Sequence, residues 1–153
     1  MKGLYLESAI PPGATILIDT SVALAYLTGT EHASPAAVQL FDAFVATGRN
    51  AAALSVVTVG EILVRPFKAG PSAVATAEGF LRHFGEIQIL DVTYDVAREA
   101  ARIRAATGIR MPDALVIASA VISNVEIVVT NDRAWAAVTP IAPEVRFCAL
   151  EAR

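Results

Sequence analysis

The chain has 153 residues, which suits one domain with a substantial core. Although 55% of its residues are hydrophobic, the longest apolar run, 114–122, is far shorter than the ~20 residues of a membrane-spanning helix. Its net charge of −3 disfavours a broadly basic nucleic-acid-binding surface. One cysteine and two histidines disfavour a disulfide framework and a zinc site. We therefore expect a cytoplasmic protein with no membrane segment, and its apolar excess favours an oligomer or a bound partner.

Apolar runs and helical patterns alternate along the sequence, as in α/β proteins. Strands are predicted at 14–18, 52–57, 87–90, 126–130 and 145–148, the last at an edge of the sheet. Helices are predicted at 22–27, 34–47, 58–66, 71–84, 94–106 and 111–122. This order predicts a three-layer α/β/α domain in which helices flank a central parallel sheet of four to five strands. Residues 1–13 are expected to form an N-terminal extension, and residues 14–153 a single domain.

Residues 111–132 form the most informative stretch, a helix that leads into a buried strand. Pro112 suits the first helical position, and Asp113 follows in the first turn, where the helix dipole favours an anion. Asp132 comes just after the strand. Because the helix and the strand have similar lengths, the helix begins near the edge where the strand ends. The sequence therefore predicts that Asp113 and Asp132 lie on one edge of the sheet.

Four acids occupy places where a strand ends or a helix begins: Asp19, Glu61, Asp113 and Asp132. Each has a structural explanation of its own. Asp19 could cap a helix, and Glu61 could form a capping box with Thr58. Asp113 could complement a helix dipole, and Asp132 could shape a turn. On one desolvated edge, however, four carboxylates would repel one another unless they were protonated or bound a cation.

Oxygen ligands without histidine or cysteine suit Mg²⁺ or Mn²⁺ better than zinc. A carboxylate-held Mg²⁺ is typical of phosphoryl transfer and phosphodiester hydrolysis. Asp91 also follows an apolar strand, and we interpret it as a helix cap, with Asp95 as a first-turn partner of the helix dipole.

Four short motifs stand in order along the chain. They are ILIDTS at 16–21, SVVTVGEI at 55–62, PDALVIASA at 112–120 and VVTND at 128–132. Together they resemble the motifs of PIN-domain nucleases, and the chain is most similar to the small VapC-like toxins of type II toxin–antitoxin pairs. The resemblance covers about 14–148. It implies a PIN-like fold and places the family's acidic metal ligands at Asp19, Glu61, Asp113 and Asp132.

The resemblance further implies a metal-dependent endoribonuclease with Mg²⁺ or Mn²⁺ as cofactor, RNA as substrate, a small antitoxin protein as partner and a homodimeric state. Hydroxyls at Thr20, Ser21 and Thr130 could orient the ligands or a water, or could serve only strand ends and helix caps. Arg133 and Arg110 are candidates for phosphate contacts, or are simply solvated.

Two other functions stay open. The chain could be a non-catalytic PIN-like binding module, which the intact acidic quartet disfavours and the low positive charge favours. It could also be an aspartyl-phosphate hydrolase, but that chemistry uses a second Asp two residues after the nucleophile, where this chain has Ser21. Residues 22–27 and 56–67 are candidates for the antitoxin groove, with core packing as the alternative.

Overall fold

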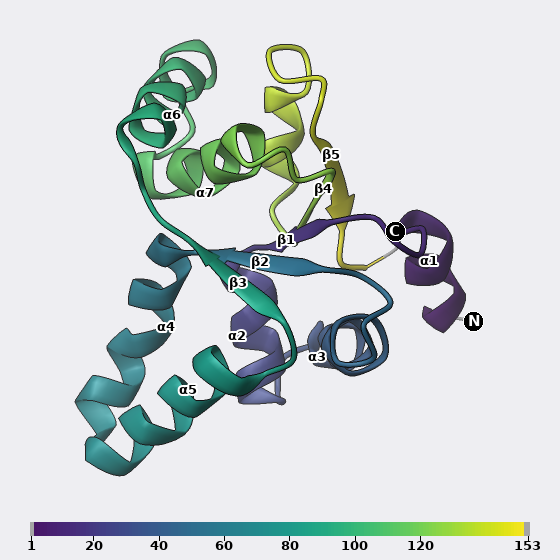
Figure 1. Cartoon of the computed structure of the whole chain (residues 1–153), viewed down its shortest axis with the longest axis vertical. Coiled ribbons are helices and arrows are strands. Elements are labelled where there is room, and N and C mark those ends of the chain that lie inside the picture. The colour runs from purple at the N-terminus through teal and green to yellow at the C-terminus, as the bar shows by residue number, and fades with distance from the viewer. Residues whose placement is uncertain (1, 152–153) are drawn as a thin grey trace.

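A five-stranded parallel sheet forms the centre of the computed structural model, which describes residues 2–151 (Figure 1). The strand order is β3-β2-β1-β4-β5, and every neighbouring pair is parallel. The strands are β1 (Ile16–Ile18), β2 (Ala52–Ser55), β3 (Ile87–Leu90), β4 (Ile127–Thr130) and β5 (Arg146–Ala149). The predicted parallel sheet is confirmed, and the last strand lies at its edge as expected.

The order of the strands reverses between β1 and β4. From β1 the chain builds β2 and β3 on one side, and then returns to build β4 and β5 on the other. Ile18 and Val129 pair near the ends of the two strands. In open α/β sheets such a switch point leaves a crevice at the carboxyl ends of the strands, where ligands bind.

Helices cover both faces of the sheet (Figure 1). One face packs against α6 (Tyr94–Thr107), α7 (Met111–Ile122) and the 3₁₀-helix η2 (Arg133–Val138). The other packs against α2 (Thr20–Thr28), α3 (Ser34–Val38), η1 (Gln39–Val45), α4 (Val56–Ala69) and α5 (Pro71–His83). Alternation along β1 directs Leu17 into the first core and Ile16 and Ile18 into the second. The three-layer α/β/α prediction is therefore confirmed.

The junction between β2 and α4 differs from the prediction. The strand ends at Ser55 rather than at residue 57, because the Ser55 hydroxyl caps the helix by accepting from the backbone N–H of Val57 at 3.1 Å. Thr58 is therefore inside the helix and does not cap it. The helix also continues through Pro66 to Ala69, whereas we predicted its end near Pro66.

Three further segments were predicted incompletely. No element was predicted in 1–13, yet α1 (Lys2–Ala9) forms there and contributes Leu6 to the core. The predicted helix 34–47 is divided into α3 and the π-helix η1. Asp91 does not cap α6, because Thr93 does so by accepting from the backbone N–H of Val96 at 3.2 Å. Asp95 lies in the first turn of α6, as predicted.

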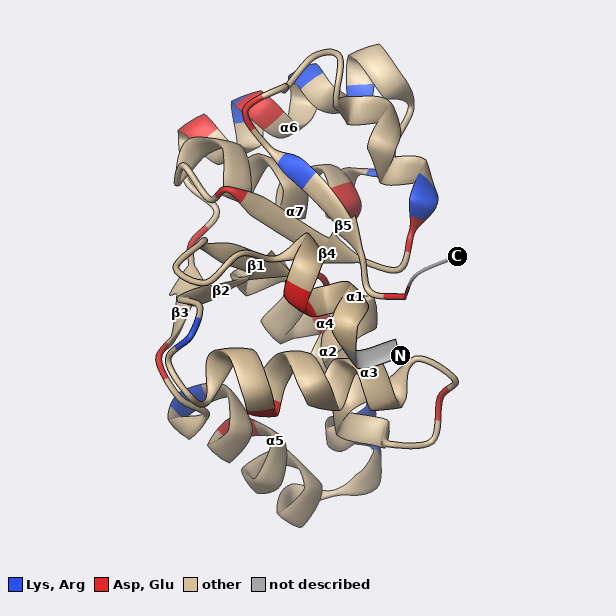
Figure 2. Cartoon of the chain, turned by 90° about the vertical axis from the view of Figure 1, so that its right-hand side faces the viewer, with Lys and Arg blue, Asp and Glu red and all other residues tan. Residues whose placement is uncertain are grey.

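The described residues contain no helix that is both long enough and apolar enough to cross a membrane. Basic and acidic residues are interspersed along the ribbon in Figure 2. This distribution agrees with the small net charge of the chain.

Candidate active site

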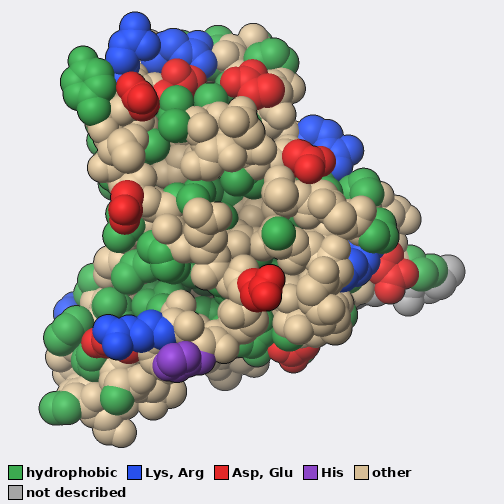
Figure 3. Space-filling model, viewed as in Figure 1, with side chains coloured by type: hydrophobic (Ala, Val, Ile, Leu, Met, Phe, Trp, Pro, Cys, Tyr) green, Lys and Arg blue, Asp and Glu red, His purple; other side chains and the backbone are tan. Residues whose placement is uncertain are grey.

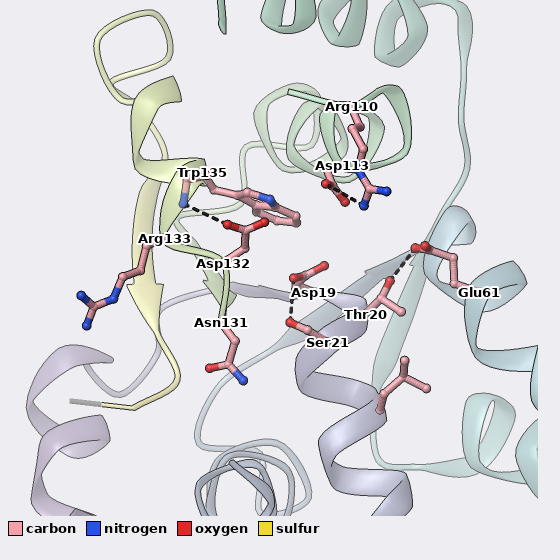
Figure 4. Close-up of a pocket in the computed structure, with 12 residues that line it drawn as sticks. Asp19, Thr20, Ser21, Glu61, Arg110, Asp113, Asn131, Asp132, Arg133 and Trp135 are labelled. Carbon is pink, nitrogen blue, oxygen red and sulfur yellow. Dashed lines mark hydrogen bonds and ion pairs between the residues drawn. The ribbon is translucent and has the colours of Figure 1, made fainter. Parts of the chain in front are cut away.

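A pocket of about 580 Å³ opens at the switch point, where β1 and β4 end and α4 and α7 begin (Figure 4). All four of the predicted acids line it, although they come from distant parts of the sequence. The lining residues are Asp19, Thr20, Ser21, Leu24, Glu61, Arg110, Asp113, Asn131, Asp132, Arg133, Ala134 and Trp135. Asp91 is not among them, since it follows the edge strand β3.

Asp19 is the most buried of these acids, with 5% of its surface exposed. Its backbone N–H donates to the carbonyl of Val129 at 3.0 Å, which ties the end of β1 to β4. Its Oδ2 accepts from the hydroxyls of Ser21 at 2.9 Å and Thr130 at 2.8 Å. Asp19 occupies the N-cap position of α2 but makes no cap bond there, so the helix-cap interpretation is wrong.

Burial has an electrostatic consequence for Asp19. Loss of solvation and, to a smaller extent, the nearby charge of Asp113 raise its pKa to about 6, although the hydrogen bonds from Thr130 and Ser21 oppose the shift. A carboxylate kept ionised at neutral pH in such a place favours a cation beside it.

Glu61 belongs to the second turn of α4 and is held by a chain of hydroxyls. Thr20 Oγ1 lies 2.8 Å from Glu61 Oε1 and 2.9 Å from Thr58 Oγ1. An ionised carboxylate only accepts, so the single hydroxyl proton of Thr20 goes to Glu61 and Thr58 donates to Thr20. The capping-box interpretation of Glu61 is therefore wrong. Thr58, fully buried, is a site residue that the sequence analysis assigned to a cap instead.

Asp113 and Asp132 complete the acidic set. Asp113 lies in the first turn of α7, as the dipole argument predicted, and its Oδ2 is 3.5 Å from Nη2 of Arg110. Asp132 caps η2 by accepting from the backbone N–H of Ala134 at 2.9 Å, so the turn-shaping interpretation is confirmed while the residue also lines the pocket. In Figure 4, Asp19, Asp113 and Asp132 surround a common space, and Glu61 stands to one side beyond Thr20.

The donor set fits a hard divalent cation, because carboxylate and hydroxyl oxygens are what Mg²⁺ and Mn²⁺ prefer. Its arrangement is open: within residues 2–151, no three His, Cys, Asp or Glu side chains lie close enough together to form a ready-made metal cluster. Mg²⁺ needs no such cluster, since it is usually held by one or two carboxylates, with waters and substrate phosphates as its other ligands. The pocket therefore fits a cation that shares its ligands with a substrate.

The two candidate arginines lie differently. Arg110 is 80% exposed and extends from the start of α7 past Asp113 toward Glu61 (Figure 4). Arg133 lines the pocket, but its guanidinium points away from the carboxylates. It also borders a second hollow together with His32 and Glu151. Of the two, only Arg110 therefore reaches toward the acids.

An apolar surface lies on the hairpin formed by α4 and α5, on the left of Figure 3 below the sheet. Val56, Val64 and Phe67 of α4 are 38%, 53% and 68% exposed. Two shallow hollows follow this hairpin, one around Phe67 and one around Val56. We call Val56, Val64 and Phe67 the α4 apolar face. In the other predicted groove segment, 22–27, most side chains belong to the core.

The fold and pocket define a class, an α/β domain with a carboxylate-lined pocket at its topological switch point. The model of the PIN domain family matches residues 16–139, and the chain belongs to this family. Members of the family are in general nucleases. A comparison with curated proteins found no match.

Several solved structures of similar fold come from toxin–antitoxin systems. A toxin–antitoxin complex from Klebsiella pneumoniae matches with a TM-score of 0.65 and 22% identity, over 86% of this chain and 95% of that one. VapC20 from Mycobacterium tuberculosis is described as a Sarcin-Ricin loop cleaving toxin. It matches with a TM-score of 0.64 and 19% identity, over 80% of this chain and 95% of that one. VapBC-5 from the same organism matches with a TM-score of 0.59 and 26% identity, over 90% of this chain and 99% of that one.

Proposed function

We propose that the protein is a metal-dependent endoribonuclease and the toxin of a toxin–antitoxin pair. The observation that carries the proposal is the convergence of Asp19, Glu61, Asp113 and Asp132 on one pocket at the switch point. Membership of the PIN family and the likeness to VapC20 support it. The raised pKa of Asp19 also supports it, because a structural carboxylate gains nothing from such burial.

In this proposal Asp19, Asp113 and Asp132 hold Mg²⁺ or Mn²⁺, and Glu61 joins them directly or through a water. A metal ion held by these residues would supply the Lewis acidity that activates a water for attack on phosphorus and that stabilises the leaving oxygen. Ser21 and Thr130 fix the orientation of Asp19 through their bonds to Oδ2.

Thr20 fixes the orientation of Glu61 in the same way. Arg110 and Arg133 donate to phosphate oxygens of the RNA. For Arg133 this requires its side chain to turn, since its guanidinium points away from the carboxylates in Figure 4.

A second candidate is a PIN-like module that binds partners without cleaving RNA. The open spacing of the carboxylates favours it, because no three of the described acids form a metal cluster as they stand. The buried, doubly hydrogen-bonded Asp19 favours catalysis instead, since a binding surface has no use for it.

One assay separates the two. Purified, partner-free protein is incubated with a structured RNA and, separately, with small phosphate esters, with and without Mn²⁺ and with EDTA, beside Asp19→Asn. We expect cleavage that EDTA and the substitution both abolish. Metal binding without cleavage by the wild type would favour the binding module. Turnover of small phosphate esters without RNA cleavage would favour the aspartyl-phosphate hydrolase.

We further propose that a small antitoxin protein packs on the α4 apolar face, and that the toxin forms a homodimer in the cytoplasm. Exposed Val64 and Phe67 suit an apolar helix or strand of a partner. Similar structures were solved as toxin–antitoxin complexes, which supports the antitoxin as occupant. Light scattering of the protein alone and with its antitoxin tests both points, and a dimer lost on substitution of Phe67 would assign this face to a second copy of the chain.

A further inference from the structure

Trp135 is the only tryptophan in the chain and is 2% exposed. Its indole N–H has no hydrogen-bond partner within residues 2–151, and no other side-chain N or O atom buried there lacks one. A buried tryptophan normally finds a partner for this group, because an unpaired buried donor loses its hydration without compensation. The unpaired N–H therefore calls for an explanation.

The position of Trp135 indicates what the partner is. The residue lines the same pocket as the four acids, and its indole ring reaches from η2 across Asp132 toward Asp113 (Figure 4). Asp132 holds the start of η2, through its bond to the backbone N–H of Ala134. The turn that places one acid in the pocket thus also places the indole there.

An N–H group cannot bind a cation and needs an oxygen acceptor. The four carboxylates already accept from Ser21, Thr130, Thr20, Ala134 and Arg110. A phosphate brought in by a metal ion would add oxygens to the pocket. The indole N–H is neutral, so unlike Arg110 it does not compete with a metal for the carboxylates.

We propose that the indole N–H of Trp135 donates a hydrogen bond to a phosphate oxygen of the RNA substrate and thereby helps to seat the phosphate next to the carboxylates. This inference rests on the proposed nuclease function and adds a substrate contact to it. The nitrogen has less than 1 Å² exposed, so the ring must tilt to reach a bound oxygen. Binding of the substrate therefore alters the surroundings of the only tryptophan in the chain.

Tryptophan fluorescence provides a readout that does not depend on catalysis. The protein is titrated first with Ca²⁺, which takes similar oxygen ligands, and then with a short single-stranded RNA whose integrity is checked on a gel. We expect a change in intensity or wavelength on addition of RNA that saturates at one RNA per site. A change caused entirely by Ca²⁺, with no further change on RNA binding, would overturn the proposal, because the donor would then serve a metal-bound carboxylate.

Two variants test the hydrogen bond itself. Trp135→Phe removes the N–H and part of the ring, and benzothienylalanine at position 135 replaces only the N–H by sulfur. Tyr94→Phe is the matched control, because it removes one polar atom from an aromatic side chain that is 81% exposed and outside the pocket. We expect both changes at position 135 to weaken RNA binding about tenfold or more by calorimetry, as for loss of a hydrogen bond to a charged group, and the control to leave it unchanged.

The results separate this inference from the function on which it rests. Wild-type protein that neither binds nor cleaves RNA would overturn both. Wild-type protein that cleaves RNA while both modified forms bind it with unchanged affinity would overturn the role of Trp135 alone. If Trp135→Phe folds poorly, the benzothienylalanine protein decides the outcome, since its ring has nearly the same shape.

Discussion

Two helices bring an acid to the pocket and then continue very differently. α7 carries Asp113 in its first turn and buries most of the residues that follow against the sheet and α6. Among its large apolar side chains, only Met111 and Ile122, at its two ends, are more than a third exposed. α4 carries Glu61 and is longer, yet Thr58 and Ile62 are its only fully buried residues. Its Val56, Val64 and Phe67 stay exposed.

The difference follows from how each helix meets the sheet. α7 lies on the sheet and is covered by α6, whereas α4 starts at the sheet and extends away from it with α5 (Figure 1). Each helix needs only its first two turns to place its acid. The rest of α7 therefore serves the core, while the rest of α4 is available to a partner. Under the proposed function, chemistry and partner binding should be separable by mutation.

The largest expected effect comes from Asp19, at the centre of the pocket. Asp19→Asn keeps the shape and can still accept from Ser21 and Thr130, but it removes the charge that we propose holds the metal. We expect RNA cleavage to fall on the order of a thousandfold, measured as initial rates with Mn²⁺. Binding of the antitoxin at α4 should not change. A variant that retains substantial activity would show that Asp19 does not hold the metal.

Substitutions on the α4 apolar face should weaken antitoxin binding and leave RNA cleavage unchanged, the reverse of the effect of Asp19→Asn. Phe67→Ser combined with Val64→Ser removes exposed apolar surface, and we expect antitoxin binding to weaken about a hundredfold, as for loss of a contact worth 2–3 kcal/mol. Cleavage by the free protein and its melting temperature should stay close to those of the wild type, since both residues are exposed.

Tyr94→Ser on α6 is the control for this pair, because it removes an aromatic side chain that is 81% exposed from the helix layer on the opposite face. It should leave antitoxin binding unchanged. If the α6 and α4 substitutions weakened antitoxin binding equally, the antitoxin would not bind specifically to the α4 apolar face.

The sequence predicted the helices α4 and α7 but not how each of them meets the sheet. The strands and most helices were predictable, because apolar runs and cap residues act over a few neighbouring positions. The strand order was not, because it depends on which runs pair across long separations. The start of α4 was misplaced by two residues because the β-branched Val56 and Val57 favour a strand, and the cap at Ser55 overrides that preference.

The four acids were predictable because each stands where a strand ends or a helix begins. The residues that surround and orient these acids were less predictable. Thr58 was noted only as a helix cap, yet it acts through Thr20, 38 positions away. Trp135 has no functional signal in the local sequence, and its proposed role depends on a pocket formed by four separate segments. Local patterns therefore locate the acids, and the contacts between segments define how they are held.

Acidification provides a third test. The pKa of Asp19 is raised from 3.8 to about 6, so the native metal-free protein binds a proton more tightly than the unfolded chain. The contribution of Asp19 to stability therefore falls as pH rises from about 4 to above 6, by up to about 3 kcal/mol. Metal binding needs the ionised form, so metal affinity should fall about tenfold per pH unit below 6.

Denaturation at several pH values and metal titration followed by calorimetry measure the two trends. Asp19→Asn should flatten the stability profile over this range and should make the metal-free protein more stable at pH 7. A stability profile that is the same in both proteins would mean that the pKa of Asp19 is not raised.

The smallest expected effect concerns Thr58, which acts on Glu61 only through Thr20. Thr58→Val keeps the volume and removes the hydroxyl that donates to Thr20, so that Thr20 is less firmly oriented toward Glu61. We expect a stability loss of about 1 kcal/mol and a cleavage rate lowered by up to about tenfold, with a higher metal concentration needed for half-maximal rate.

Thr58→Ser restores the hydroxyl and should recover the metal dependence even though it leaves a small cavity in the core. Loss of stability in both variants without a change in metal dependence would mean that Thr58 only packs the base of α4. A rescue by serine would instead show that the first turn of α4 is built for Glu61, in contrast to the exposed turns that follow it.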